Sequence, residues 1–395
     1  MRETENSPEL LKLSSSISCH DQIKVSPNFK ILVPNPRQDT LRFEIPKLLY
    51  SFLYWTGLIP ESGEGKSFMK KWIIFPVLLL MGIVDFLILL NSYVDFASWR
   101  LAIGHFVPEI ISLVIWYALH RKRINLKMIL HKLQDVPPSN HERILHFLAF
   151  VIPLVPVLYT TIITIISNSQ NTVNKLAYGY EVKNRFVGIL ILLTKRMIHI
   201  IMFPTFHCLI LLLYCVICLR CSCFIRHLAQ EVVLFSSEEF GPSKQISILR
   251  SKAKMDDLLE LIQDIFSVPT FFLFVANFVS CFRIIGWHFV TYWEEVRVIH
   301  SVFYGTASFM CLIGMLWVAG GLPTEVDDLK KKFYKKAHLR LIFVPTSKEP
   351  RFKKELLEEP EFCFSGWDIL PYKRSSILAI MGALFTYTAL AFTFK

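Results

Sequence analysis

The sequence predicts an all-α integral membrane protein with seven transmembrane helices, a cytoplasmic amino terminus and an extracellular carboxyl terminus. The first reason is composition, because 53% of the 395 residues are hydrophobic and the mean hydropathy is +0.43. Soluble domains rarely reach these values. The second reason is a series of apolar runs, and the third is an unequal distribution of Lys and Arg between the segments that join them.

An apolar run of about 20 residues can cross the hydrocarbon core of a bilayer as a helix. Polar residues and a proline between positions 104 and 109 weaken the second run, and residues 187–193 form an apolar approach to the fourth run from outside. The last run ends beside Lys395, as we expect where lipid is the solvent. The seven predicted spans are residues 72–93, 101–119, 146–166, 197–219, 266–287, 299–322 and 375–394.

The basic residues predict the orientation of the chain. One set of connecting segments carries 34 of the 43 Lys and Arg residues, and the other set carries 8. The positive-inside rule places the first set in the cytoplasm together with the amino terminus. G-protein-coupled receptors have the opposite orientation, which disfavours that class. Because the basic residues lie between apolar runs, the net charge of +11 indicates membrane topology rather than nucleic-acid binding. The basic set comprises residues 1–71, 120–145, 220–265 and 323–374.

Three segments follow from this organisation. Residues 1–45 are polar, so we expect cytoplasmic disorder and no cleavable signal peptide. Residues 46–71 form an amphipathic juxtamembrane segment that is too short to span, and it lies on the inner membrane surface or packs under the bundle. Residues 72–394 form the seven-helix membrane domain, with cytoplasmic helical extensions in 220–265 and 323–374.

The motifs of enzymes and metal sites are missing from the sequence. It has no Gly-rich phosphate loop, no GxSxG and no HExxH, so we predict no enzyme and no cofactor. It also lacks the two-half repeat of many transporters. A cluster of Cys residues at the inner end of the fourth span suits zinc poorly and palmitoylation better, but plain apolar packing is favoured over both. These residues are Cys215, Cys218, Cys221 and Cys223.

Small and polar residues follow one face of the last predicted helix. They recur at spacings of three and four, which places them in one stripe. Such a stripe can line a pore, where hydroxyl groups offer acceptors to a partly dehydrated cation. It can equally allow close helix packing, which the periodicity alone favours. The stripe consists of Ser375, Ala379, Gly382, Thr386, Ala389 and Thr393.

Polar and aromatic side chains in the outer halves of the spans are candidates for a ligand pocket, because aromatic planes with hydrogen-bonding tips suit small amphipathic molecules. The alternative is that they belong to the membrane interface, where Trp, Tyr and His are common. We also expect Asp85 to pair within the bundle and Arg283 to reach outward to the interface. The pocket candidates are His105, Glu109, Tyr159, Thr160, Arg196, His199, Trp287, His288, His300 and Tyr304.

The carboxyl-terminal 60 residues or so contain a connected pattern. The sequence FCFSGWDIL at 362–370 is followed by Arg374-Ser375, then Gly382-Ala383 and Thr386-Tyr387. This pattern resembles the carboxyl-terminal signature of arthropod gustatory receptors, which ends in Thr-Tyr, five apolar residues and Gln-Phe. The segments 317–329 and 54–60 are similar to other elements of that family. Thr393 stands where the family usually has Gln.

The resemblance implies a subunit of a ligand-gated, non-selective cation channel in which four subunits surround one pore. It implies a small-molecule tastant as ligand, a pocket among spans two to six, and a homo- or hetero-tetramer. The expected location is the plasma membrane of a chemosensory neuron dendrite, in contact with lipids. Two alternatives stay open: a seven-span receptor that signals through cytoplasmic partners, and an auxiliary subunit that does not gate alone. The implied pore residues are Gly382, Thr386, Tyr387, Ala389, Thr393 and Phe394.

Overall fold

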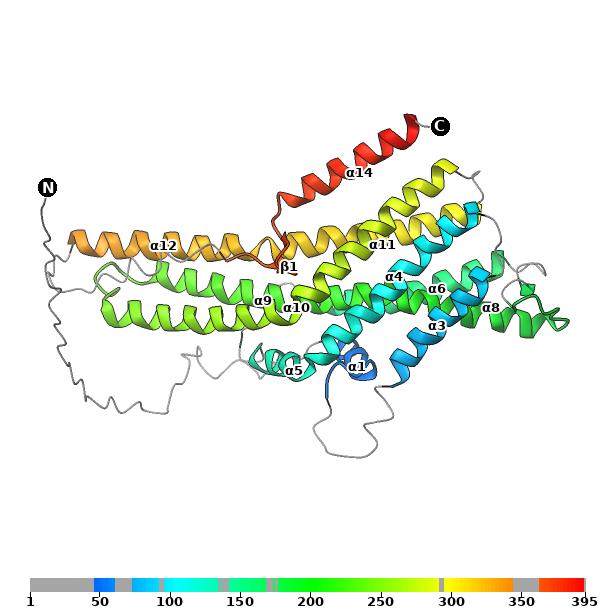
Figure 1. Cartoon of the computed structure of the whole chain (residues 1–395). Helices are drawn as coiled ribbons and strands as arrows, with labels where there is room; N and C mark the ends of the chain where they lie inside the picture. Colours follow the sequence, from blue (N-terminus) through cyan, green and yellow to red (C-terminus); the bar gives the residue numbers. More distant parts are fainter. Residues whose placement is uncertain are drawn as a thin grey trace, which may run out of the picture. The chain divides into compact units, whose positions relative to one another are not determined.

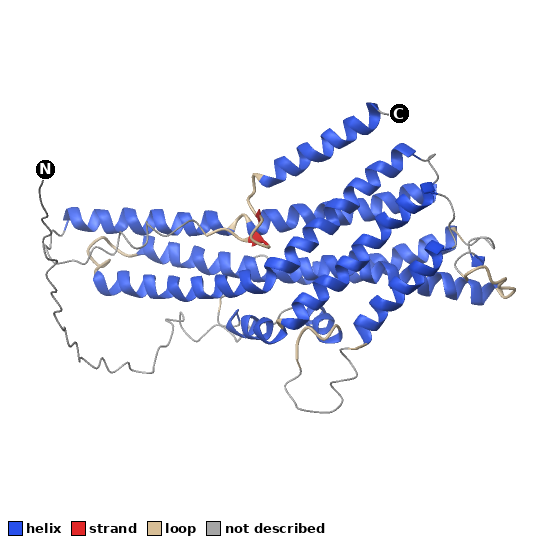
Figure 2. Cartoon of the chain, in the orientation of Figure 1, coloured by secondary structure: helices blue, strands red, loops and turns tan. Residues whose placement is uncertain are grey.

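The computed structural model of the chain is built almost wholly from helices (Figure 1; Figure 2). It describes residues 46–60, 73–91, 96–133, 136, 142–167, 173–174, 177–290, 295–343 and 362–393. The predicted disorder of residues 1–45, the segment 61–72 and the pore candidate Phe394 lie outside the described residues. The elements are α1 (Lys47–Trp55), α3 (Ile74–Asn91), α4 (Phe96–Arg121), α5 (Arg123–Lys132), α6 (Glu142–Ile166), α8 (Arg185–Ile200), η2 (Ile201–Thr205), α9 (Phe206–Leu234), α10 (Pro242–Val290), α11 (Glu295–Ala319), α12 (Leu322–Phe343), β1 (Ser365–Gly366), β2 (Leu370–Pro371) and α14 (Ser376–Thr393).

Each predicted span coincides with helical structure, in chain order α3, α4, α6, α8–η2–α9, α10, α11 and α14. The predicted all-α membrane fold is therefore confirmed, whereas the orientation of the termini stays a prediction. Within the described residues, α3 and α14 contain shorter apolar stretches, Phe75–Asp85 and Ser376–Leu390. Four segments there are long and apolar enough to cross a membrane, namely Glu142–Ile166, Arg185–Leu234, Pro242–Ile285 and Val298–Phe343.

The fourth span differs from the prediction, because its helix begins at Arg185 rather than at residue 197. Asn184 explains the early start, since its side-chain Oδ1 accepts hydrogen bonds from the backbone N–H groups of Phe186 (2.9 Å) and Val187 (3.4 Å). Such a cap provides an acceptor for backbone N–H groups of the first helical turn that have no partner within the helix. The helix then passes through the wide turn η2, where Pro204 and an extended Phe203 bend it.

The short helix α1 packs against the bundle through its apolar face. Leu49 and Leu53 have no exposed surface, and Phe52 lies edge-on to Phe75 of α3 with ring centroids 6.5 Å apart. Trp116 of α4 donates its indole N–H to the backbone oxygen of Thr56 at 2.9 Å. These contacts fix the segment at one end of α4.

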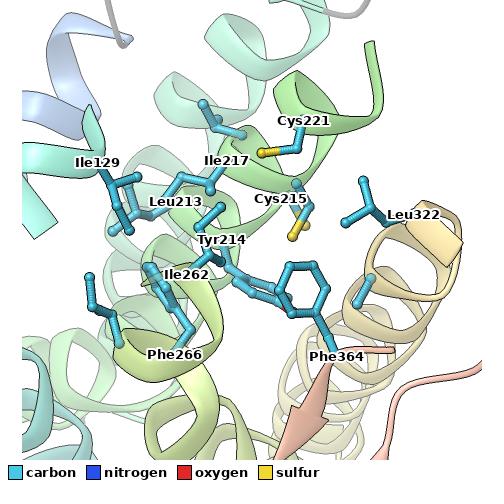
Figure 3. Close-up of a cluster of buried hydrophobic side chains, with 14 of the residues drawn as sticks. Ile129, Leu213, Tyr214, Cys215, Ile217, Cys221, Ile262, Phe266, Leu322 and Phe364 are labelled. Carbon is cyan, nitrogen blue, oxygen red and sulfur yellow. The ribbon is translucent and has the colours of Figure 1, made fainter. Parts of the chain in front are cut away.

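The hydrophobic core gathers around α9, whose residues are buried on nearly all sides (Figure 3). Side chains from α5, α10, α12 and the segment before β1 meet there, among them Ile129, Phe266 and Phe364. Burial of this apolar surface stabilises the bundle end that is predicted to be cytoplasmic. Cys215, Cys218 and Cys221 lie in this core with at most 9% exposure, so packing accounts for their positions.

Two arginines of α9 illustrate opposite uses of charge. Arg220 is 1% exposed, donates to the backbone oxygen of Val136 at 2.6 Å and pairs with Glu142 at the start of α6. Arg226 is 54% exposed and pairs with Glu325 in the first turn of α12 at 2.5 Å. In the Arg220 pair, protein groups replace the water that would surround the charge, whereas the Arg226 pair remains hydrated.

A small hairpin connects the bundle to α14. β1 and β2 pair antiparallel, with Gly366 opposite Leu370. Tyr372 is fully buried beneath the hairpin, and a Cβ atom added at Gly366 would lie 2.2 Å from its hydroxyl oxygen, so only glycine fits. Burial raises the pKa of the Tyr372 phenol, which keeps this group neutral.

Glutamine 263 of α10 holds the hairpin in place. Gln263 Nε2 donates to the backbone oxygen of Ser365 (3.0 Å) and to its Oγ (2.6 Å), and Gln263 Oε1 accepts from the Ser365 N–H (3.1 Å). The Trp367 N–H donates to the backbone oxygen of Ser267 at 3.1 Å. The start of α14 is thereby fixed to α10.

The two glutamates of the arginine pairs give a matched test of these contacts. Glu142→Ala removes the carboxylate that pairs with the buried Arg220 charge, so we expect a loss of about 3–5 kcal/mol in the free energy of unfolding. Glu325→Ala breaks the exposed pair with Arg226, and we expect a loss within about 1 kcal/mol. Thermal unfolding of the purified full-length protein in detergent micelles measures both. Equal losses in the two variants would contradict this assignment.

Candidate ligand-binding site and pore helix

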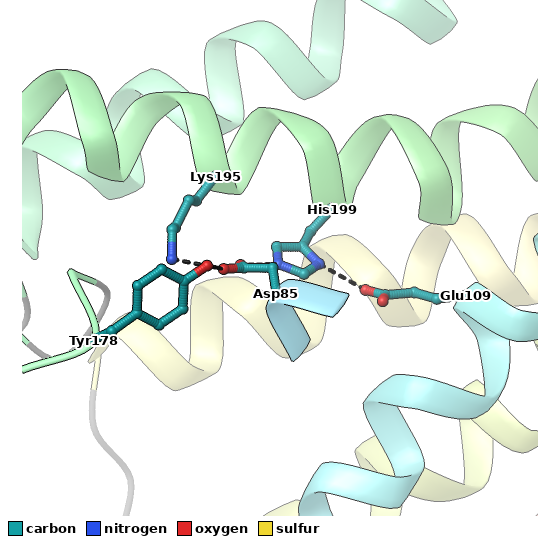
Figure 4. A network of polar contacts seen from close by, with 5 residues as sticks. All are labelled: Asp85, Glu109, Tyr178, Lys195 and His199. Atoms are coloured by element: carbon teal, nitrogen blue, oxygen red, sulfur yellow. Dashed lines mark hydrogen bonds and ion pairs between the residues drawn. The ribbon is translucent and has the colours of Figure 1, made fainter. Parts of the chain in front are cut away.

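A network of polar side chains joins α3, α4 and α8 inside the membrane domain (Figure 4). Lys195 Nζ donates to Asp85 Oδ1 at 2.6 Å, and the Tyr178 hydroxyl donates to the same oxygen. His199 lies between two carboxylates: its Nδ1 is 2.7 Å from Glu109 Oε1, and its Nε2 is 3.4 Å from Asp85 Oδ2. The expectation that Asp85 pairs within the bundle is confirmed.

Helical spacing explains why α8 can supply both basic groups. Lys195 and His199 are four residues apart, so they share one face of the helix. Asp85 comes to that face from α3 and Glu109 from α4, and their side chains are 13% and 7% exposed. Burying a charge at this depth costs free energy unless the charge is paired. This cost explains why the four residues lie together.

Aromatic side chains of α6 and α11 form a second cluster. Tyr159 stacks on Phe303 with ring centroids 4.0 Å apart, and its hydroxyl shares a hydrogen bond with Nδ1 of His300. Tyr304 lies edge-on to Tyr159 at 6.4 Å and stacks on Phe203 of η2 at 6.0 Å. The cluster therefore brings α6, η2 and α11 together around aromatic planes.

The outward reach of Arg283 stays a prediction. Its guanidinium carbon lies 5.6 Å from the centroid of the Tyr304 ring, and its Nε is buried. A cation over an aromatic face gains electrostatic attraction that compensates part of its lost hydration. Arg283 thus belongs to the surroundings of the aromatic cluster.

The structure assigns the predicted pocket candidates to different surroundings. Thr160 is buried and donates to the backbone oxygen of Pro156 in its own helix at 2.7 Å, while Arg196 donates to Thr164 Oγ1 at 3.4 Å. The backbone of the remaining three candidates is helical, but their side chains lie outside the described part of the chain. The five candidates that join a cluster are Glu109, His199, Tyr159, His300 and Tyr304, and the three undescribed side chains are those of His105, Trp287 and His288.

A pocket of about 400 Å³ lies between α3 and α8 and extends to the segment before α8. Among the predicted candidates whose side chains are described, His199 alone lines it. Its other polar lining residues are Asp85, Tyr178, Thr194 and Lys195. These four were not predicted from the sequence as pocket residues, although the carboxylate of Asp85 in an apolar run was a visible signal.

Helix α14 exposes its stripe of small and polar residues in the single chain. Gly382, Thr386, Ala389 and Thr393 are all exposed, and the hydroxyls of the two threonines donate to backbone oxygens four residues earlier. Because each hydroxyl hydrogen is donated to the helix backbone, the hydroxyl oxygen remains available as a hydrogen-bond acceptor. Tyr387 instead lies edge-on against Phe282 of α10 with centroids 4.6 Å apart.

Solved structures of an insect receptor have the same fold. The insect olfactory receptor OR5 from Machilis hrabei matches with a TM-score of 0.64 and 13% identity, covering 87% of this chain and 95% of that chain. The same receptor in complex with eugenol matches with a TM-score of 0.58 and 14% identity, over 89% and 97% of the two chains. No protein-family model and no curated protein sequence matches the chain.

The ion pair between α3 and α8 can be tested by a double-mutant cycle. Lys195→Met removes the ammonium group that pairs with the buried Asp85 carboxylate, so we expect a loss of about 3–5 kcal/mol in unfolding free energy. Asp85→Asn should also destabilise, and combining the two changes should recover part of the loss. Thermal unfolding in detergent micelles provides the four values. Strictly additive effects would show that the two charges do not interact.

Proposed function

We propose that this chain is a taste-type chemosensory receptor that acts as a subunit of a ligand-gated, non-selective cation channel in the plasma membrane. The observation that carries the proposal is the shared fold with an insect olfactory receptor over 87% of the chain. The carboxyl-terminal resemblance to gustatory receptors supports the taste class. The assembly is a tetramer of this chain, alone or with related subunits, and the activity is not enzymatic.

Helix α14 supplies the pore in this proposal. Its exposed stripe offers hydroxyl acceptors at Thr386 and Thr393 and room at Gly382 and Ala389. Beside the stripe lie apolar side chains such as Phe385, which is 68% exposed in the single chain and needs lipid or a neighbouring subunit. The stripe carries no carboxylate, so selectivity among cations is weak.

A ligand in the outer half opens the channel by population shift. It binds the open state more tightly, and the difference in affinity moves the equilibrium. The aromatic cluster suits a small amphipathic molecule because ring faces and the polar tips of Tyr159, His300 and Tyr304 lie together. The related fold of OR5 has been solved with eugenol, a small aromatic molecule. Helices α6 and α11 then transmit the change to α14, which contacts α11 and α10.

The orientation of the chain distinguishes this function from G-protein-coupled signalling. With one epitope tag before Met1 and another after Lys395, we expect antibody staining of intact cells for the carboxyl tag alone. The amino-terminal tag should stain after permeabilisation, because basic segments keep that side in the cytoplasm. The reverse staining would contradict both the orientation and the channel.

Thr393→Leu tests the pore. The change removes a hydroxyl and adds apolar bulk on the proposed pore face, so we expect it to abolish or sharply reduce ligand-evoked current while surface expression is kept. Thr388→Leu is the matched control, since Thr388 lies on the half-buried side of the same helix. Whole-cell recording with surface biotinylation measures both quantities. Normal current in the Thr393 variant would remove this helix face from the pore.

A further inference from the structure

The pocket between α3 and α8 is separate from the aromatic cluster and has its own chemistry. Its volume of about 400 Å³ lies within the range of small-molecule sites. Most of the wall surface is apolar, and Met81, Leu190, Ile191 and Ile198 contribute aliphatic side chains to it. The polar groups of Asp85 and its partners occupy one region of that wall. This division suits an amphiphile with an aliphatic body and a polar end.

One carboxylate oxygen of the polar region has fewer and longer hydrogen-bond contacts than the other. Asp85 Oδ1 accepts from Lys195 and Tyr178, but Oδ2 has only a 3.4 Å contact with His199 Nε2 within the described part of the chain. Behind it, Glu109 Oε2 is buried and has no hydrogen-bond partner among the described residues. A carboxylate oxygen without a donor at this depth is unfavourable.

The same arrangement disfavours an anionic ligand. The Lys195 ammonium lies 3.6 Å from the centroid of the Tyr178 ring and is 2.6 Å from Asp85 Oδ1, so the carboxylate and the ring already stabilise it. An added carboxylate or phosphate would face Asp85 at close range. A protonated amine instead brings donors and a positive charge, which the Asp85 carboxylate can accept through Oδ2.

We propose that the α3–α8 pocket binds a lipophilic primary amine, with its ammonium group on Asp85 Oδ2 and its alkyl chain along Ile191 and Leu190. The amine is a free alkylammonium or the headgroup of an aminophospholipid. This inference goes beyond channel activity, because it concerns binding and holds whether or not the site gates a pore.

Binding of tritiated n-octylamine to the full-length protein in phosphatidylcholine nanodiscs tests the proposal, with empty nanodiscs subtracted. We expect saturable binding that unlabelled n-octylamine displaces and that octanoate and n-octanol displace poorly. The double variant Asp85→Asn/Lys195→Met removes both charges without leaving either unpaired. It should weaken binding by about tenfold or more, as loss of a hydrogen bond to a charged group predicts.

Two further variants separate loss of the site from loss of the fold. Ile191→Trp fills the aliphatic part of the pocket without altering a charge, and we expect it to abolish binding while size-exclusion profile and thermal midpoint are kept. Glu181→Gln is the matched control, since this exposed acid lies outside the pocket lining and should leave affinity unchanged. If the double variant fails to fold, the Ile191 variant decides the outcome alone.

The source of the amine is distinguished by the lipid. Weaker n-octylamine binding in nanodiscs that contain phosphatidylethanolamine identifies the lipid headgroup as the occupant, and unchanged binding identifies a free amine. Equal displacement by octanoate and n-octanol, or full binding by the Ile191 and double variants, would overturn the proposal. None of these outcomes depends on current, so failure of the channel assignment leaves the binding result interpretable.

Discussion

Backbone groups inside a bilayer have no water to bond, and this constraint shapes the molecule more than any other. In the part of the chain that the structure describes, the seven predicted apolar runs lie in helices, where the amide and carbonyl groups satisfy one another. The short strands β1 and β2 come before the last apolar run rather than within one. Even the bend at Pro204 stays surrounded by buried side chains, so its freed backbone groups do not face lipid.

The same lack of water governs the charges. Asp85, Glu109, Lys195 and His199 come from three helices and meet in one network, which binds those helices together as it lowers the cost of burying each group. At the other end of the bundle, Arg220 and Glu142 connect α9 to α6 in a comparable way. Polar contacts of this kind specify which helix faces meet, whereas the apolar core of α9 supplies most of the stabilising burial.

Much of the fold could be predicted from the sequence because hydropathy alone decides which segments enter lipid. The early start of α8 could not, since it depends on the side chain of Asn184 and lies in a segment that carries Lys195 and Arg196. Lys195 precedes the predicted fourth span, which begins at residue 197, and its pairing with Asp85 requires knowledge of which helices are neighbours. His199 and Tyr304 belong to side-chain clusters, in agreement with their prediction as polar groups in the outer halves of the spans. Thr160 instead donates its hydroxyl hydrogen to a backbone oxygen of its own helix. The hydrogen bonds between Gln263 and the hairpin correspond to no local sequence pattern, because they join residues about 100 positions apart.

The attachment of Ser365 and Trp367 to α10 makes the start of α14 a fixed point. A helix of 18 residues is about 27 Å long, so rotation about one end moves its residues in proportion to their distance from that end. A tilt of about ten degrees displaces the far end by roughly 5 Å and the first turn by less than about 1 Å. In the tetramer that we propose, a tilt about the hairpin would widen the distance between neighbouring copies of this helix most near Thr393 and least beside Ile377.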